Sequence, residues 1–146
     1  MNIFSTRKPS LQDAEVIAQL ATELGYPTSG QQCLARLKAL LQSPEHRIIV
    51  ACDALNIVVG WIHVYLAYSL ESDPYAEIAG LIVTADYRKT GIGGMLIKAV
   101  EEWVKKSGVK KLRVRSRVER DEAQAFYTHS GFKQTKQQNV FDKVLR

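Results

Sequence analysis

Residues 76–106 read AEIAGLIVTADYRKTGIGGMLIKAVEEWVKK and contain three predicted elements in direct succession. The first, 76–84, is almost continuously apolar apart from Glu77, which is typical of a strand buried on both faces. The last, 91–107, repeats apolar residues at helical spacing and predicts a long amphipathic helix. The glycine-rich segment 88–94 follows the strand and includes the start of the helix, so we expect a buried strand that turns directly into a helix.

The sequence on both sides of this stretch predicts further strands and helices. Their bounds come from alternating runs, helical periodicity, capping residues and Gly or Pro punctuation. The predicted elements are a strand over 2–7, helices over 10–24 and 28–42, hairpin strands over 47–52 and 57–66, a strand over 112–116, a helix over 121–129 and two weak strands in the tail, 132–145. The order βααββ-βα-βα-ββ favours an α/β (α+β) fold, with a mixed central sheet of about seven strands flanked by about four helices.

The length and composition predict one globular domain over residues 1–146. Apolar residues make up 46% of the chain, which is enough for a core, and charged residues make up 24%. No run approaches the ~20 apolar residues of a membrane span, and the N-terminus lacks the apolar part of a signal peptide, so we expect a cytoplasmic protein with no membrane partner. Cys33 and Cys52 are expected to be reduced and buried. The histidines and acids show no ligand spacing, so we expect no metal site.

The positive charge of the chain is concentrated in one segment. Residues 88–120 contain 11 Lys or Arg and 3 acidic residues, a net charge of +8, whereas the rest of the chain has a net charge of −3. A solvated helix face with exposed strand ends would explain this segment, but the glycines inside it favour an anionic ligand. Nucleic-acid binding is the poorer interpretation, because the chain has no helix-turn-helix, zinc or aromatic RNA-binding pattern.

The turn at 88–94 has the position of a phosphate-binding site. The first amides of a helix lack intrahelical acceptors and carry partial positive charge, and glycine lets a phosphate approach the backbone. The P-loop pattern GxxxxGK[ST] is absent, and GxGxxG fails because Leu96 stands three residues after Gly93. A tight turn that holds no ligand is the alternative.

Two motifs lie at the turn and near the end of the basic segment. The first is RxxGxG between a buried strand and a long helix, and the second is AxxFYxxxGF on the helix after the fifth strand. They are formed by Arg88, Gly91 and Gly93, and by Ala123, Phe126, Tyr127, Gly131 and Phe132. In this order the two motifs resemble those of the GNAT family of N-acetyltransferases. The predicted element order is also similar to that of the family, which implies a mostly antiparallel sheet and extends the resemblance over nearly the whole chain.

The resemblance implies how acetyl-CoA would be held. Backbone groups of Leu81, Ile82 and Val83 would hydrogen-bond the pantetheine arm like an added strand. The pyrophosphate would be wrapped by the amides of Lys89, Thr90, Gly91, Ile92, Gly93 and Gly94, with positive charge supplied by Arg88 and Lys89. Many members have an Asn that contacts the pantetheine seven residues before the tyrosine. Arg120 stands at that position here and would reach the cofactor instead.

The resemblance also implies catalytic roles for Tyr127 and Glu77 in direct attack of an amine on the thioester. Tyr127 stands where the family has its usual general acid, although a helix tyrosine is also a common core residue. Glu77 is the candidate base, because histone-acetylating members carry a catalytic glutamate at the matching place, eleven residues before Arg88. Alternation would put Glu77 on the strand face of Ala79 and Leu81. Equally open is that Glu77 only neutralises a neighbouring Arg or Lys.

These inferences predict an acetyl-CoA-dependent N-acetyltransferase that acts on a small or peptidic primary amine. The alternative is a non-catalytic acyl-CoA-binding or sensor protein of the same fold. Members that acetylate protein N-termini often have a glutamate on the fifth strand, where this chain has Arg115, which disfavours a close match to them. The family habit also implies a homodimer, as do the apolar residues of the last segment, Val140, Phe141, Val144 and Leu145.

The acceptor amine is expected to bind near the loop 24–30 and the region 61–75. That region offers aromatic and acidic side chains, which suit a cationic amine. These residues are Trp61, Tyr65, Tyr68, Glu71, Asp73 and Tyr75. Polyamine-like, aminoglycoside-like, amino-acid and lysine acceptors all fit this description, so the sequence leaves the acceptor open.

Overall fold

The computed structural model describes residues 3–146, so the predicted start of the first strand at residue 2 lies outside the described residues. The chain forms two compact units, Met1–Arg115 and Ser116–Arg146. The first unit contains β1 (Ser5–Arg7), η1 (Leu11–Asp13), α1 (Ala14–Glu23), α2 (Gly30–Leu41), β2 (His46–Cys52), β3 (Val58–Ala67), β4 (Tyr75–Val83), η2 (Ala85–Tyr87), α3 (Ile92–Lys106) and β5 (Leu112–Val114). The second unit contains α4 (Asp121–His129). Within the described residues, no helix has the length and apolar character needed to cross a membrane.

The sheet has five strands in the order β1-β2-β3-β4-β5. The three pairs formed by β1 to β4 are antiparallel, and β5 runs parallel to β4. The hairpin of β2 and β3 pairs His46 with Tyr65 at its open end. The prediction of a mixed, mostly antiparallel sheet with four helices is therefore confirmed for the described chain.

The prediction of about seven strands is wrong. Residues 132–146 contain no helix or strand, so the final ββ of the predicted order is missing. The apolar side chains of this tail stay in solvent, with Val140 80% and Phe141 90% exposed. A strand is stable only when its backbone finds a ladder partner and one of its faces is buried, and the tail has neither. Alternating apolar residues alone did not make strands here.

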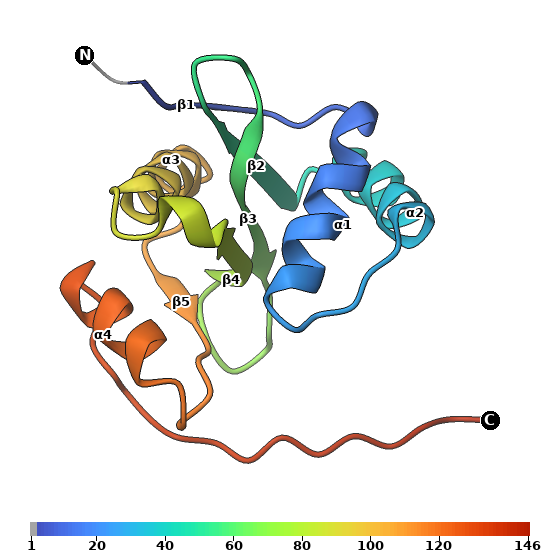
Figure 1. The fold of residues 1–146 in the computed structure, drawn as a ribbon. Helices are drawn as coiled ribbons and strands as arrows, with labels where there is room; N and C mark the ends of the chain where they lie inside the picture. Colours follow the sequence, from blue (N-terminus) through green and yellow to red (C-terminus); the bar gives the residue numbers. More distant parts are fainter. Residues whose placement is uncertain (1–2) are drawn as a thin grey trace. The chain divides into compact units, whose positions relative to one another are not determined.

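Helices cover both faces of the sheet in the first unit (Figure 1). On one face α1 and α2 pack on the sheet, and the indole N–H of Trp61 donates to the carbonyl of Ile17 in α1 at 3.2 Å. Alternation turns the neighbouring β3 residues to the other face, where a Cβ at Gly60 would lie 3.5 Å from Ile92 of α3. Leu96 of α3 is completely buried. The apolar stripe predicted over 91–107 is thus the face that α3 packs on the sheet.

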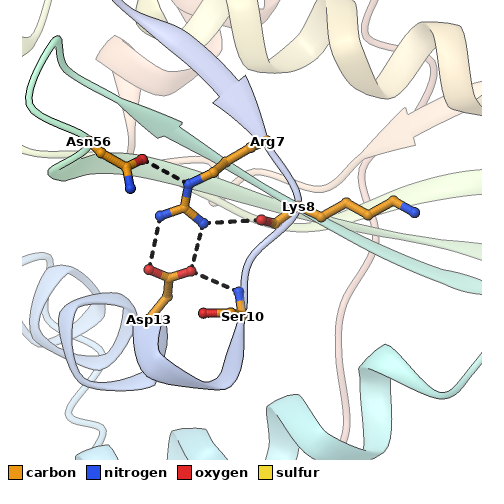
Figure 2. A network of polar contacts seen from close by, with 5 residues as sticks. All are labelled: Arg7, Lys8, Ser10, Asp13 and Asn56. Carbon is orange, nitrogen blue, oxygen red and sulfur yellow. Dashed lines mark hydrogen bonds and ion pairs between the residues drawn. The ribbon is translucent and has the colours of Figure 1, made fainter.

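The N-terminal strand is held to the first helix by a polar network (Figure 2). Arg7 donates through its two terminal nitrogens to Asp13 at 2.8 and 3.0 Å, and the Ser10 amide also donates to Asp13 at 2.8 Å. Arg7 Nε reaches Asn56 in the turn between β2 and β3 at 3.0 Å. The hydrogen bonds from Arg7 hold the pKa of Asp13 below its usual value. Asp13 is 8% exposed, so the network fixes where α1 begins.

Candidate active site

Strand β4 contains a bulge directly after Glu77 and Ile78. Val64 of β3 pairs with Ile78, but His63 pairs with Gly80, so Ala79 is an extra residue without a β3 partner. Gly80 therefore follows Glu77 on the same face of the sheet. The expectation from simple alternation, that Glu77 shares its face with Ala79 and Leu81, is wrong because the bulge shifts the phase by one residue.

The bulge also marks where the pairing of β4 with β5 ends. The parallel ladder joins Ala76, Glu77 and Ile78 to Leu112, Arg113 and Val114. Beyond the bulge, the segment 80–83 pairs with β3 on one edge, and no strand of the described chain pairs with its other edge. The backbone of Leu81, Ile82 and Val83 thus lies on a stretch of β4 where an extended ligand could add as a further strand.

The glycine-rich turn forms the N-terminus of α3. Gly91 is the N-cap with φ +90°, a left-handed conformation that suits glycine, and Lys89 also has a positive φ of 63°. Met95 N–H donates to the Gly91 carbonyl, and the preceding amides of Ile92, Gly93 and Gly94 belong to the first turn. A Cβ at Gly91 or Gly94 would meet no atom within 4 Å.

The side chains that precede these amides are cationic. Arg88 and Lys89 are exposed, and the Thr90 hydroxyl donates to the Tyr87 carbonyl, which ties the turn to η2. A helix N-terminus, open glycines and two cations together make a surface that can take an anionic group. The predicted phosphate-binding position therefore has suitable geometry, in a long helix that also packs on the sheet.

Glu77 lies in a polar cluster of three side chains. The Tyr65 hydroxyl donates to Glu77 Oε2 at 3.1 Å, and Arg115 Nε lies 3.2 Å from both carboxylate oxygens. Glu77 is 8% exposed, whereas the Arg115 side chain is 50% exposed. The charge of Glu77 raises the pKa of Arg115, and burial together with that charge raises the pKa of Tyr65. The carboxylate thus has a cationic and a neutral donor as partners.

Tyr75 lies next to this cluster and carries two cations over its ring. The guanidinium carbon of Arg113 is 4.3 Å from the ring centroid, and Lys111 Nζ is 5.8 Å from it. Parallel pairing puts Arg113 directly beside Glu77. The basic segment found in the sequence therefore supplies the neighbours of the buried carboxylate as well as those of the glycine turn.

A pair of histidines on the same face was missed by the sequence reasoning. His46 Nδ1 lies 2.9 Å from His63 Nε2, and the ring of Tyr65 stacks on His46 with centroids 5.5 Å apart. Burial, with a smaller contribution from His46, lowers the pKa of His63 to about 4. The hairpin register could have revealed this pair, because it sets position 46 opposite 65 and position 48 opposite 63. In the described chain no group of three or more His, Cys, Asp or Glu is placed to hold a metal.

In the second unit, the second motif forms the C-terminal cap of α4. The amide of Phe132 donates to the carbonyl of Tyr127 at 3.0 Å, and that of Gly131 donates to Thr128 at 3.1 Å, with Gly131 at φ +96°. This is the Schellman pattern, and its usual apolar contact is present because the rings of Tyr127 and Phe132 lie 5.6 Å apart. Arg120 is the exposed N-cap residue of the same helix. The spacing FYxxxGF thus fixes the orientation of the Tyr127 ring at the end of α4.

The chain is similar in sequence and in structure to known acetyltransferases. Residues 13–132 match the family model "Acetyltransferase (GNAT) family". An aminoglycoside N(6')-acetyltransferase type 1 of Stenotrophomonas maltophilia is 30% identical over 143 residues, which cover 95% of this chain and 92% of that protein. An uncharacterized N-acetyltransferase of Bacillus subtilis is 25% identical over 130 residues, which cover 88% of this chain and 87% of that protein.

Solved structures show the same fold at lower identity. The aminoglycoside 6'-N-acetyltransferase AAC(6')-Ih from Acinetobacter baumannii has a TM-score of 0.86 at 18% identity and covers 97% of this chain and 99% of its own. The enzyme AAC(6')-Iy, in complex with the bisubstrate analog CoA-S-monomethyl-acetylneamine, has a TM-score of 0.87 at 20% identity. The match covers 99% of this chain and 100% of that enzyme's chain. The family model and the 30% identical relative both span most of the chain. The chain therefore belongs to the acetyltransferase (GNAT) family.

Proposed function

We propose that the protein is an N-acetyltransferase that uses acetyl-CoA as the acyl donor and a primary amine as the acceptor. The observation that carries this proposal is the glycine turn at the N-terminus of α3, close in sequence to the unpaired edge of β4. The two features supply anion-binding amides and a free strand edge in one segment, 79–94. A nucleotide with a long extended arm needs both.

The residues of this segment fit acetyl-CoA. The backbone of Leu81, Ile82 and Val83 would pair with the amide groups of pantetheine, and the helix N-terminus would bind the pyrophosphate. The open space at Gly91 and Gly94 is what a phosphate needs to come within hydrogen-bond distance of the amides. The residues that we assign to the pyrophosphate are Arg88, Lys89, Thr90, Gly91, Ile92, Gly93 and Gly94, and Arg120 is assigned to the cofactor as well.

The reaction is direct transfer without an acyl-enzyme. The amine nitrogen attacks the thioester carbonyl carbon, a C–N bond forms, and the C–S bond breaks with its electron pair on sulfur. The acceptor ammonium must first lose one proton to a base, and the thiolate leaves with a proton from an acid. The second proton on nitrogen, released after the attack, restores that acid. The protein thus has to supply one base and one acid.

Glu77 is the proposed base and Tyr127 the proposed acid. Glu77 is almost buried and the Tyr65 hydroxyl lies on its Oε2, so the amine proton reaches the carboxylate by way of that hydroxyl. The raised pKa of Tyr65 keeps its hydroxyl protonated at neutral pH, as this transfer requires. Tyr127 is held at the end of α4 by the Schellman cap, which restricts the orientation of its ring. The pair of Glu77 with Arg115 supports the ion-pair interpretation to the same extent, so the two roles need a kinetic test.

Turnover is the decisive test of this proposal against a non-catalytic acyl-CoA-binding protein. Purified protein is incubated with acetyl-CoA and a panel of primary amines, and the released CoA thiol is measured. The panel includes aminoglycosides, which are named as the substrates of the relatives, together with polyamines, amino acids and a lysine peptide. We expect thiol release that depends on one class of amine. If the protein binds acetyl-CoA but releases no CoA thiol with any amine of the panel, it is an acyl-CoA-binding protein and not an acetyltransferase.

Tyr127→Phe tests the acid, because it removes one hydroxyl and keeps the ring that packs on Phe132. A general acid contributes about 10²- to 10⁴-fold, so we expect kcat to fall by roughly that factor while KM for acetyl-CoA changes little. Phe126→Tyr, one position earlier on α4, is the matched control for aromatic packing. Full activity of Tyr127→Phe with the preferred acceptor would show that the assignment is wrong.

Glu77→Gln tests the base through its pH dependence. The rate loss is expected to be largest near neutral pH and to shrink as alkaline pH deprotonates the acceptor in solution. A purely structural role in the pair with Arg115 would instead give a defect that stays constant up to the pKa of the acceptor. The pH profile of kcat/KM between these two limits therefore separates the two interpretations of Glu77.

We further propose that the enzyme is a cytoplasmic homodimer. Val140, Phe141, Val144 and Leu145 are between 80% and 90% exposed, which is unusual for four apolar residues in one short segment. A second copy of the chain would cover them. Sedimentation should give twice the 16.4 kDa of one chain, and a monomer at high concentration would refute the dimer.

The proposed cytoplasmic location is supported by the cysteines. The two buried free thiols, Cys33 and Cys52, suit a reducing compartment.

A further inference from the structure

Strand β5 and its two flanking residues present a row of cations on the sheet face that carries Glu77. Lys111, Arg113 and Arg115 stand at alternate positions, and Arg113 pairs with Glu77 in the parallel ladder. Arg115 Nε contacts both Glu77 oxygens at 3.2 Å, and the other two cations lie 4.3 and 5.8 Å from the ring centroid of Tyr75. One cation of the row, Arg115, is therefore paired with the Glu77 carboxylate, and the other two lie over the Tyr75 ring.

The two arginines of this row are oriented before any ligand arrives. The guanidinium of Arg113 lies over the Tyr75 ring, a contact that holds its plane and restricts its rotamers. Arg115 is oriented by Glu77 through Nε, and half of its side chain is exposed to solvent. A planar guanidinium matches a carboxylate with two parallel hydrogen bonds, which a lysine cannot do. Oriented arginines two residues apart thus favour recognition of a carboxylate.

On the basis of the proposed N-acetyltransferase activity, we propose that the acceptor is a small amine that also carries a carboxylate, as an amino acid does. Arg113 and Arg115 bind the carboxylate, and the amine lies beside Tyr65 and Glu77. Because Arg115 directly contacts Glu77, the amine and the carboxylate of the acceptor are separated by only a few bonds.

The same charges disfavour a polycation as the acceptor. Each additional ammonium group of an aminoglycoside or a polyamine would meet the excess positive charge of the row, and like charges brought together reduce affinity. Glu71 and Asp73, the acids that the sequence suggested for a cationic acceptor, are exposed in the loop before β4. Exposed acids are screened by water and salt, so they compensate little for Arg113, which is only partly exposed and lies over the Tyr75 ring. The acceptor class therefore differs from the aminoglycosides named for the relatives.

Matched pairs of acceptors that differ only in the carboxylate test this proposal. Lysine is compared with cadaverine, ornithine with putrescine, and phenylalanine with phenethylamine, and neamine serves as the aminoglycoside. The rate of CoA thiol release gives kcat/KM for each compound with the wild type, with Arg113→Met and with Arg113→Lys. Lys98→Met, which removes an exposed cation from α3, is the charge-matched control. Circular dichroism and the thermal midpoint verify that each variant is folded.

We expect the wild type to prefer an amino acid over its carboxylate-free partner by at least about tenfold in kcat/KM. Arg113→Met should abolish that preference through a higher KM for the amino acid, with the carboxylate-free amine within about threefold of wild type. Arg113→Lys should keep part of the preference, and Lys98→Met all of it. A wild-type preference for neamine or for carboxylate-free amines, or an equal loss on both members of a pair in Arg113→Met, would overturn this inference alone. No turnover with any amine would overturn the proposed activity and this inference with it.

Discussion

Gly94 offers a substitution whose effects on stability and on cofactor binding have opposite signs. It is the third residue of α3, it is exposed, and a Cβ there would meet no atom within 4 Å. Leucine is a better helix former than glycine by roughly 0.5–1 kcal/mol, so Gly94→Leu should stabilise the free protein. For a chain of this size that corresponds to a rise in Tm of about 1–4 °C. The leucine side chain would, however, lie across the amides that we assign to the pyrophosphate.

The assay is thermal unfolding with and without acetyl-CoA. A ligand at a hundredfold excess over its Kd stabilises the folded protein by about 2.7 kcal/mol, which for this size is a Tm shift of roughly 5–10 °C. Gly94→Leu should lose this shift although its own Tm is higher. Gly91→Ala is the contrasting variant, because φ +90° penalises an L-residue by about 1–2 kcal/mol and should lower the Tm of the free protein. Glu101→Leu, two turns further along α3, controls for an added leucine.

Two outcomes would refute this reasoning. If Gly94→Leu keeps the whole ligand-induced shift, the pyrophosphate does not bind at the N-terminus of α3. If the free Gly94→Leu protein is less stable than wild type, the gain in helix propensity does not determine the effect of a side chain at position 94. Because the expected signs differ, a loss of binding cannot be attributed to partial unfolding.

Asp13→Asn should destabilise the protein by about 2 kcal/mol at pH 7 in urea unfolding, because it breaks a partly buried bidentate ion pair. The pKa of Asp13 is lowered on folding, so its stabilisation is present above the usual carboxyl pKa and is lost as the pH falls from about 5 toward 3. The gap between wild type and variant should close over that range, and a constant gap would contradict the ion-pair explanation. Gly60→Ala should cost more than Gly80→Ala: the first Cβ would lie 2.9 Å from the Ile82 carbonyl oxygen, whereas the second would lie 3.0 Å from the Trp61 ring, which can shift. Urea midpoints compare the two variants, and an equal or reversed order would mean that β4 moves more easily than the indole.

The parts of the fold that the sequence predicted are those with a strong local pattern. The helix over 91–107 and the hairpin of β2 and β3 have many apolar residues at a single period, and both are found within a residue or two of their expected bounds. The tail at 132–145 has a similar pattern over only a few residues. Whether such a segment becomes a strand depends on a partner strand and on burial, which are not local properties, and the prediction of two strands was wrong.

The candidate site also has a part that the local sequence predicted and a part that depends on distant residues. The glycine turn could be predicted because its chemistry depends on consecutive residues, and the structure gives it the expected place at a helix N-terminus. The partners of Glu77 could not be predicted, because Tyr65 and Arg115 are 12 and 38 residues away in the chain and meet it only through strand register. The pair of His46 and His63 depends on a different register, that of the predicted hairpin of β2 and β3. The roles of Glu77 and Tyr127 in catalysis stay predictions.

The bulge residue Ala79 is a position in β4 where the strand can lose one residue without reversing the faces of its neighbours. Residues on either side of Ala79 keep their faces if Ala79 is lost, because the bulge already offsets the alternation by one position. A chain without Ala79 would therefore keep its core but could continue the ladder between β4 and β5 past Ile78. A one-codon deletion at this point would be tolerated by folding and would close the strand edge to a ligand. Elsewhere in β4 the same deletion would turn core side chains outward.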